Sequence, residues 1–255
     1  MRGTCSCSKA RRSMSVFDTT VGRAPADSGH LVSADSAANV PLAPAHFDVP
    51  AGSRIEALKK RTPKPGEAAF FYHDHHFQVD TVKVLPGEYY VSQDDLMVTT
   101  VLGSCIAACI WDPNIRVGGM NHFMLPEGGG DTSGRYGSYA MELLINEMIK
   151  LGARRETMQA KVFGGGQVMH SFTAMNIGER NTQFVLDYLQ TERIVIISKD
   201  VLDIHPRKVC YFPATGKAMV KRLAHAHPET LETQERNSAA ALAAKSKAGG
   251  SVDLF

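Results

Sequence analysis

Two short apolar runs separated by a polar turn dominate the middle of the chain. Residues 106–111 form an Ile-rich run that is too short for a typical helix, and residues 117–125 form a second run that includes a Gly-Gly pair. Each run is typical of a buried strand. Asp112-Pro113-Asn114 lies between them and has turn chemistry, because proline presets one backbone dihedral and Asp and Asn side chains bond their own backbone. The pattern predicts an antiparallel hairpin.

The flanking sequence predicts two amphipathic helices and several more strands. Residues 136–151 carry apolar side chains at helical spacing and end before Gly152, a residue suited to a helix C-cap, and residues 178–190 repeat the helical pattern. Strands are predicted at 83–91, as two pieces around Pro86-Gly87, and at 96–102, 160–163, 193–198, 208–212 and 217–223. Helices alternate with strands only in the middle of the chain. This order favours an α/β sandwich of mixed, largely antiparallel sheets over a doubly wound parallel fold.

A cysteine and a histidine at the hairpin are the best candidates for a catalytic pair. If the turn centres on Pro113-Asn114, Cys105 lies directly opposite His122, and opposed residues share a face with Cβ atoms roughly 4.5–5.5 Å apart. A thiol next to an imidazole can give up its proton and attack a carbonyl, which is the chemistry of acyl transfer. Gly103-Ser104 precede the cysteine and supply a loop whose backbone N–H groups can face an oxyanion.

A third group must hold the imidazole in one tautomer, and Thr99 and Thr100 are the nearest hydroxyls in the sequence. A structural interpretation competes with each catalytic one. A cysteine in an apolar run is commonly an inert core residue, as we expect for Cys109, and a lone strand histidine is commonly a satisfied one. A metal site built from Cys105, Cys109 and His122 is a further alternative, but the sequence offers no fourth ligand.

Two other motifs invite a functional interpretation. Residues 70–77 contain three histidines among aromatic residues, but without a defined set of further ligands they are interpreted as an exposed edge leading into the domain. Gly164-Gly165-Gly166 follow a predicted strand without a Lys-Ser/Thr behind them. Three glycines after a strand can cradle phosphate, but the sequence lacks the other residues of a phosphate loop.

Composition and charge narrow the class of protein. The chain has 255 residues, of which 44% are hydrophobic, and a formal net charge of +2. So small a charge gives no reason to expect nucleic acid or an anionic membrane as a partner. No apolar stretch reaches the roughly 18 residues of a membrane-spanning helix. The five cysteines, with no paired Cys-x-x-Cys knuckles, fit the reduced thiols of a cytoplasmic protein.

The two ends of the chain differ from its middle. Residues 1–66 are rich in Ala, Ser, Pro, Asp and Gly with little hydrophobic periodicity, and are predicted to be a mostly disordered extension. Met14 is an alternative start within it. Residues 67–224 are predicted to form the folded domain, and residues 225–255 a flexible tail.

A long, ordered series of motifs covers roughly residues 68–224. The motifs are Leu102–Cys105, Trp111–Pro113, Gly118–Pro126, Arg135–Gly137, Tyr139–Asn146, Lys161–Gly165 and Ile177–Asn181. This series resembles the CheD family of chemoreceptor glutamine deamidases. The resemblance implies that Cys105 is the nucleophile, that His122 is the general base and acid, and that Thr99 orients the histidine. It also places a Gly-Gly pair at Gly164-Gly165, which predicts a close backbone approach near the site rather than a phosphate loop.

The same resemblance implies a fold, an activity and partners. The fold is a three-layer sandwich of mixed, largely antiparallel sheets flanked by helices, similar to the deamidating domain of the cytotoxic necrotizing factor toxins. The activity is conversion of specific glutamines of methyl-accepting chemoreceptors to glutamate through a cysteine thioester, with glutamate methyl esters as a secondary substrate, and no cofactor is expected. The alternative is a non-catalytic regulator that binds a CheC-type phosphatase or the receptor. The combination of a thiol and an imidazole favours the enzyme.

Overall fold

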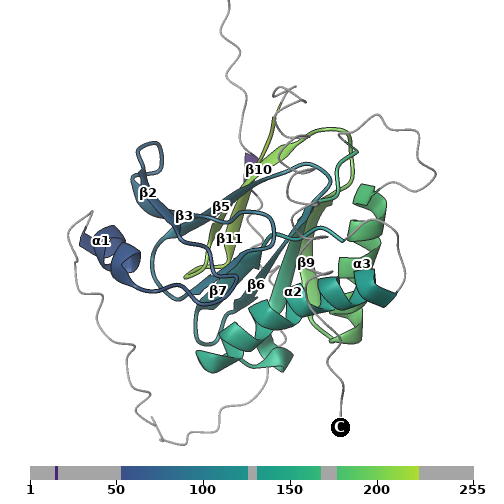
Figure 1. Ribbon diagram of the computed structural model, residues 1–255, viewed down its shortest axis with the longest axis horizontal. Coiled ribbons are helices and arrows are strands. Elements are labelled where there is room, and N and C mark those ends of the chain that lie inside the picture. Colours follow the sequence, from purple (N-terminus) through teal and green to yellow (C-terminus); the bar gives the residue numbers. More distant parts are fainter. Residues whose placement is uncertain (1–14, 17–52, 126–130, 168–176, 224–255) are drawn as a thin grey trace, which may run out of the picture.

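The computed structural model describes residues 15–16, 53–125, 131–167 and 177–223, which form two β-sheets with helices packed against them (Figure 1). The strands are β1 (Ser15–Val16), β2 (Phe70–Asp74), β3 (Val79–Lys83), β4 (Tyr89–Ser92), β5 (Met97–Leu102), β6 (Ile106–Asp112), β7 (Val117–Asn121), β8 (Gln159–Gly164), β9 (Val195–Val201), β10 (Arg207–Phe212) and β11 (Lys217–Arg222). The helices are α1 (Ser53–Lys60), α2 (Asp131–Lys150) and α3 (Ile177–Thr191), with a 3-10 turn, η1 (Arg155–Thr157).

The strands are divided between two mixed sheets. Sheet A has the order β1-β11-β10-β5-β3-β2, and sheet B has the order β4-β7-β6-β8-β9. The pairs β3–β5 and β8–β9 are parallel, and the other neighbouring pairs in the described sheets are antiparallel. The predicted class, an α/β fold of mixed and largely antiparallel sheets, is confirmed.

The layers follow from the side-chain alternation of the strands. In β6, Ala107 and Cys109 face the core between the two sheets, whereas Ile106, Ala108 and Ile110 face the core between sheet B and the helices α2 and α3. Successive side chains of a strand point to opposite faces, so a strand buried on both faces reads as a continuous apolar run. Sheet A, sheet B and the two long helices thus form three layers (Figure 1).

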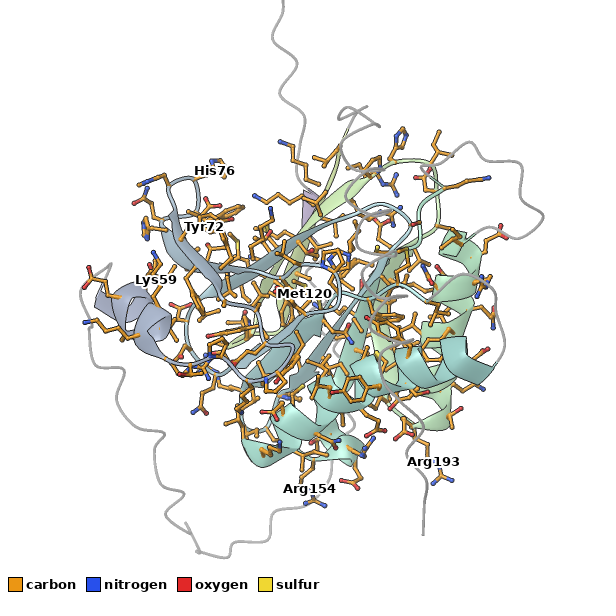
Figure 2. The ribbon with its side chains drawn as sticks, in the orientation of Figure 1. Lys59, Tyr72, His76, Met120, Arg154 and Arg193 are labelled. Carbon is orange, nitrogen blue, oxygen red and sulfur yellow. The ribbon has the colours of Figure 1, made fainter. Side chains whose placement is uncertain are left out.

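The β6–β7 hairpin forms as predicted, but its predicted register is wrong. Cys109 pairs with Met120, whereas a turn of Pro113-Asn114 alone would pair Cys109 with Gly118. The turn occupies residues 113–116 instead, so the register is shifted by two residues. Met120, which faces the inter-sheet core, lies in the interior of the molecule (Figure 2).

The register shift changes how the two candidate catalytic residues meet. Ile106 and Phe123 form an antiparallel bridge in which each N–H donates to the other carbonyl over 2.9 Å. Cys105 and His122 directly precede these two residues, so they are diagonal neighbours rather than opposed ones. A shift of two residues keeps both on one face, because side chains alternate with a period of two. Diagonal neighbours are about 7–8 Å apart, within reach of longer side chains.

The two long helices agree with the predicted ones, and a further helix, α1, lies in the N-terminal part of the chain, where no helix was predicted. α2 begins earlier than predicted, at Asp131, α3 matches its prediction closely, and Gly152 has the positive φ of 97° that suits a helix end. α1 lies inside the extension that the sequence predicts to be mostly disordered, and its Ile55 is buried in the inter-sheet core. Within the described residues, no helix is both long and apolar enough to cross a membrane.

The remaining predictions about the ends and loops cannot be placed on the fold. Apart from β1, the predicted extension up to residue 52 lies outside the described residues, as does the predicted tail. So do residues 126–130, which belong to the glycine-rich connection after the hairpin.

Candidate functional site

Three side chains from different segments meet in the layer between the two sheets. Cys105 belongs to the inter-sheet core and has no exposed surface. His122 follows β7 and is 3% exposed. Thr100 lies on β5 between Val98 and Leu102, whose side chains face the same core, so alternation directs Thr100 inward as well. The sequence-predicted nucleophile and base thus lie on one buried face.

The hydrogen bonds around His122 fix which of its nitrogens carries the proton. The Thr100 hydroxyl donates its single proton to the carbonyl oxygen of Val84, 2.8 Å away. Thr100 Oγ1 therefore accepts from Nδ1 of His122, also at 2.8 Å. With the proton on Nδ1, the lone pair is on Nε2, which is buried and has no hydrogen-bond partner in the described part of the chain. This is the tautomer that a general base requires.

The surroundings of His122 also keep its ring neutral. Burial lowers the pKa of His122 to about 4, although a hydrogen bond to the backbone of Val84 works in the opposite direction. Desolvation disfavours the charged imidazolium, so the ring is uncharged at neutral pH and able to take a proton. Protonation of the ring becomes favourable only when a negative charge arises nearby.

The expected contact of Thr99 with the histidine is made by Thr100 instead. Thr99 Oγ1 donates to the carbonyl oxygen of Val209 at 2.8 Å and lies 3.7 Å from Sγ of Cys210. Cys210 belongs to a cluster separate from the inter-sheet core. The two threonines are adjacent on β5 and point to opposite faces of sheet A, so only one of them can reach the space that holds His122.

The backbone before and at Cys105 is fixed by the predicted glycine motif. Gly165 N–H donates to the Cys105 carbonyl at 2.8 Å, and Gly166 N–H donates to the Gly103 carbonyl at 2.7 Å. Gly164 has a φ of 113°, and a Cβ there would lie 2.1 Å from the Cys105 oxygen. The structure thus contains the close backbone approach that the sequence predicted, and it forbids a side chain at Gly164.

The strand connection after β9 braces the same glycine turn. The carbonyl oxygen of Gly164 accepts from the Leu202 N–H at 2.8 Å. Arg207 has no exposed surface, and its Nη1 lies 3.4 Å from the same Gly164 oxygen. Nη1 also forms an ion pair with Asp200 Oδ1 at 2.7 Å. A buried arginine held by a carboxylate and carbonyl oxygens keeps several loop segments in one arrangement. The sequence analysis did not single out this residue.

Asn181 and Tyr136 are two further residues near the site that the sequence analysis quoted only as parts of motifs. Asn181, on α3, donates through Nδ2 to the Ser104 carbonyl at 2.8 Å and accepts at Oδ1 from the Leu125 N–H at 2.9 Å. Burial, together with the nearby charge of Cys105, raises the pKa of Tyr136 to about 12, which indicates that the two side chains are close. Both residues lie in motifs that carry the family resemblance, and this was the feature of the sequence that could have pointed to them.

The cysteines and histidines of the described residues show no arrangement typical of a metal site. Within the residues that the structure describes, no group of three or more His, Cys, Asp or Glu side chains is arranged to hold a metal ion. Burial raises the pKa of Cys109 well above its ordinary value, as expected for an inert core thiol. His73 pairs with Asp80 at 3.0 Å on the β2–β3 hairpin, and His76 lies at the periphery of the molecule (Figure 2).

Known proteins resemble this chain over much of its length. A model of the family described as "CheD chemotactic sensory transduction" matches residues 124–222. A probable chemoreceptor glutamine deamidase CheD 1 from Albidiferax ferrireducens is 67% identical over 220 residues, which are 86% of this chain and 94% of that protein. A probable chemoreceptor glutamine deamidase CheD from Thiobacillus denitrificans is 52% identical and covers 74% of this chain and 96% of its own.

The similarity to solved structures is much weaker. A hypothetical protein YfiH from Bacillus licheniformis matches 52% of this chain and 59% of its own at 12% identity, with a TM-score of 0.32. A similarity of this size has no bearing on function.

Proposed function

Because this chain belongs to the CheD family, we propose that it is a protein-glutamine deamidase that converts specific glutamine side chains of methyl-accepting chemoreceptors to glutamate. The observation that carries the proposal is the state of His122: its Nδ1–H is held by Thr100, and its Nε2 lone pair is left on the buried face that also holds Cys105. The names of the relatives supply the substrate. We place the reaction in the cytoplasm, where the signalling helices of chemoreceptors lie.

The first half of the proposed reaction forms a thioester. Nε2 of His122 takes the proton of the Cys105 thiol, and the thiolate attacks the amide carbon of the glutamine side chain. The C=O π electrons move to oxygen, which gives a tetrahedral oxyanion. When this oxyanion collapses, the C–N bond breaks, and the imidazolium gives its proton to the departing nitrogen, so that ammonia leaves.

The second half regenerates the enzyme. His122 Nε2 removes a proton from water, and the resulting hydroxide attacks the thioester carbon. The C–S bond then breaks, the sulfur takes back the proton from the imidazolium, and the glutamate side chain is released. One histidine serves as base and acid in turn, which requires a ring that gains and loses its proton easily within one cycle. A neutral resting imidazole supports the first step of each half.

The loop around the cysteine is proposed to stabilise the oxyanion. Gly103 and Ser104 precede the nucleophile, and the carbonyls of Gly103 and Cys105 are fixed by Gly166 and Gly165. Backbone N–H groups that are fixed before the reaction stabilise a developing negative charge without a reorganisation cost. Gly164 and Gly165 act in this proposal as supports for the loop, because the Gly165 N–H is engaged with the Cys105 carbonyl and the Gly164 C=O with the Leu202 N–H.

The test is mass spectrometry of a chemoreceptor cytoplasmic fragment incubated with the full-length protein. We expect a change of amide to acid, seen as the small mass increase of NH2 replaced by OH, at defined glutamines. The Cys105→Ala variant should give none, and Cys109→Ala, a change to the neighbouring core thiol, should keep the activity. No change at any glutamine across several receptors would overturn the deamidase proposal and favour the non-catalytic regulator.

A further inference from the structure

Asn181 joins the segment that holds the nucleophile to the segment that holds the base. Its side-chain amide has no exposed surface and bridges two backbone groups: the Ser104 carbonyl at 2.8 Å and the Leu125 N–H at 2.9 Å. Ser104 directly precedes Cys105, and Leu125 lies three residues after His122. A single side chain from α3 therefore contacts the main chain on both sides of the site.

The chemistry of the two partners fixes the orientation of the amide. A carbonyl can only accept and a backbone N–H can only donate, so Nδ2 must face Ser104 and Oδ1 must face Leu125. A carboxylate at this position would place an acceptor against the Ser104 carbonyl oxygen. A shorter hydroxyl would not span both groups. Asparagine is the residue whose length and donor–acceptor pair fit this bridge.

The bridge controls the direction of a group next to the nucleophile. The Ser104 carbonyl and the Cys105 N–H belong to one planar trans peptide unit, so they point in opposite directions. Holding the carbonyl on Asn181 directs the Cys105 N–H away from α3. The neighbouring carbonyls of Gly103 and Cys105 are already held by Gly166 and Gly165, so Asn181 fixes the peptide between them.

We propose that Asn181 is a positioning residue that sets the Ser104–Cys105 peptide, and with it the nucleophile, relative to His122. This inference rests on the proposed deamidase function and deepens it. The two hydrogen bonds of the Asn181 amide are made to backbone groups. Asn181 acts through the backbone of the two segments that carry Cys105 and His122, so its loss lowers the rate of the reaction rather than the binding of the receptor.

The docking of α3 has other supports, which makes the proposal separable from a general effect on folding. Val185 and Leu189 are buried in the core between sheet B and the helices. Gly178, at the start of α3, is packed so closely that a Cβ there would lie 2.4 Å from the Gly165 oxygen. Loss of the Asn181 amide therefore leaves the helix attached by its apolar face and its first turn, while it removes the side-chain hydrogen bond to the Ser104 carbonyl.

The experiment compares Asn181→Asp and Asn181→Ser with Val185→Ala in the full-length protein. Val185→Ala removes buried apolar volume from the same helix and leaves the Asn181 amide with its two hydrogen-bond partners, so it serves as the matched control for lost stability. The readouts are kcat and KM for receptor deamidation, thermal unfolding, and the pH profile of Cys105 alkylation by iodoacetamide, followed on the Cys105 peptide. Alkylation needs no receptor.

We expect kcat to fall about 10²-fold in both Asn181 variants with KM unchanged, as misplacement of a reacting group by about 1 Å can cause. The pH profile of Cys105 alkylation should change in the same variants and stay unchanged in Val185→Ala. Asn181 variants that match Val185→Ala in both kcat and alkylation profile would overturn the inference. If the wild-type protein deamidates no receptor, the proposed function fails, and the alkylation profiles alone still decide the role of Asn181.

Discussion

Two neighbouring buried side chains, Asn121 and His122, are held differently in the two cores that flank sheet B. In the core between sheet B and the helices, the Asn121 amide uses both of its ends, accepting from the Ala108 N–H and donating to the Ala140 carbonyl, each at 3.1 Å. In the core between the two sheets, His122 uses Nδ1 and leaves Nε2 without a partner in the described structure. Buried polar atoms are nearly always paired, so an unpaired one requires an explanation.

The difference separates groups that hold the fold from groups that are available for chemistry. An amide with both ends engaged adds rigidity and has nothing left to offer a substrate. An imidazole held at one nitrogen is fixed in orientation and tautomer, and its second nitrogen can take a proton. In this protein the Asn121 amide lies on the helix side of sheet B, and the proposed catalytic groups lie on the opposite face.

The largest expected effect on stability belongs to the helix-side core. Leu144→Ala removes a fully buried side chain from α2, and such truncations cost about 2–5 kcal/mol in the free energy of unfolding. We expect urea denaturation to show this loss, while kcat per folded molecule stays at the wild-type value. A fall in kcat of the folded variant would show that the packing of α2 contributes to the chemistry, contrary to the comparison.

A smaller effect, on activity, is expected from the sheet–sheet core. Thr100→Val removes the hydroxyl that holds Nδ1 of His122, and we expect kcat to fall about 10- to 100-fold because the ring loses its fixed tautomer and orientation. Receptor deamidation kinetics at several enzyme concentrations measure this effect.

Thr99→Val is the matched control for that change. It is the same substitution at the adjacent, equally buried residue, and it removes a buried hydrogen bond to the Val209 carbonyl. Each substitution leaves a buried carbonyl without its hydroxyl donor, at a cost of about 1–3 kcal/mol in stability. Only Thr100→Val should lose activity. Equal losses of kcat in both variants would contradict the assignment of Thr100 as the residue that orients His122.

The sequence predicted the strands of the site well because burial on both faces leaves a strong signal. β6 and β7 were found from their apolar runs, and α3 from its helical spacing. The register was missed because proline and asparagine indicate a turn but do not fix its length. Arg116, at the end of the turn, adopts a φ of 55°, a conformation uncommon for arginine, so local residue preference gave no sign of the longer loop.

Which residue of a strand can contact His122 depends on the face of the sheet to which its side chain points. The resemblance pointed to Thr99, but the alternation Val98, Thr100, Leu102 places the inward residue one position later. That signal was present in the sequence, since an apolar residue flanks Thr100 on each side along the same face. Asn181 gave no such signal, because an asparagine inside an amphipathic helix resembles a solvated polar position until its backbone partners, distant in sequence, are known.

The central claim is that His122 is a neutral base with its proton on Nδ1. Nitrogen-15 NMR of the histidine-labelled full-length protein tests it directly, with His122→Gln identifying the signal. At pH 7 we predict an Nδ1-protonated, Nε2-unprotonated ring, and a titration with a pKa of about 4 because burial disfavours the charged form. A ring protonated on Nε2 at pH 7, or one that titrates at or above its ordinary value of 6.5, would contradict the claim.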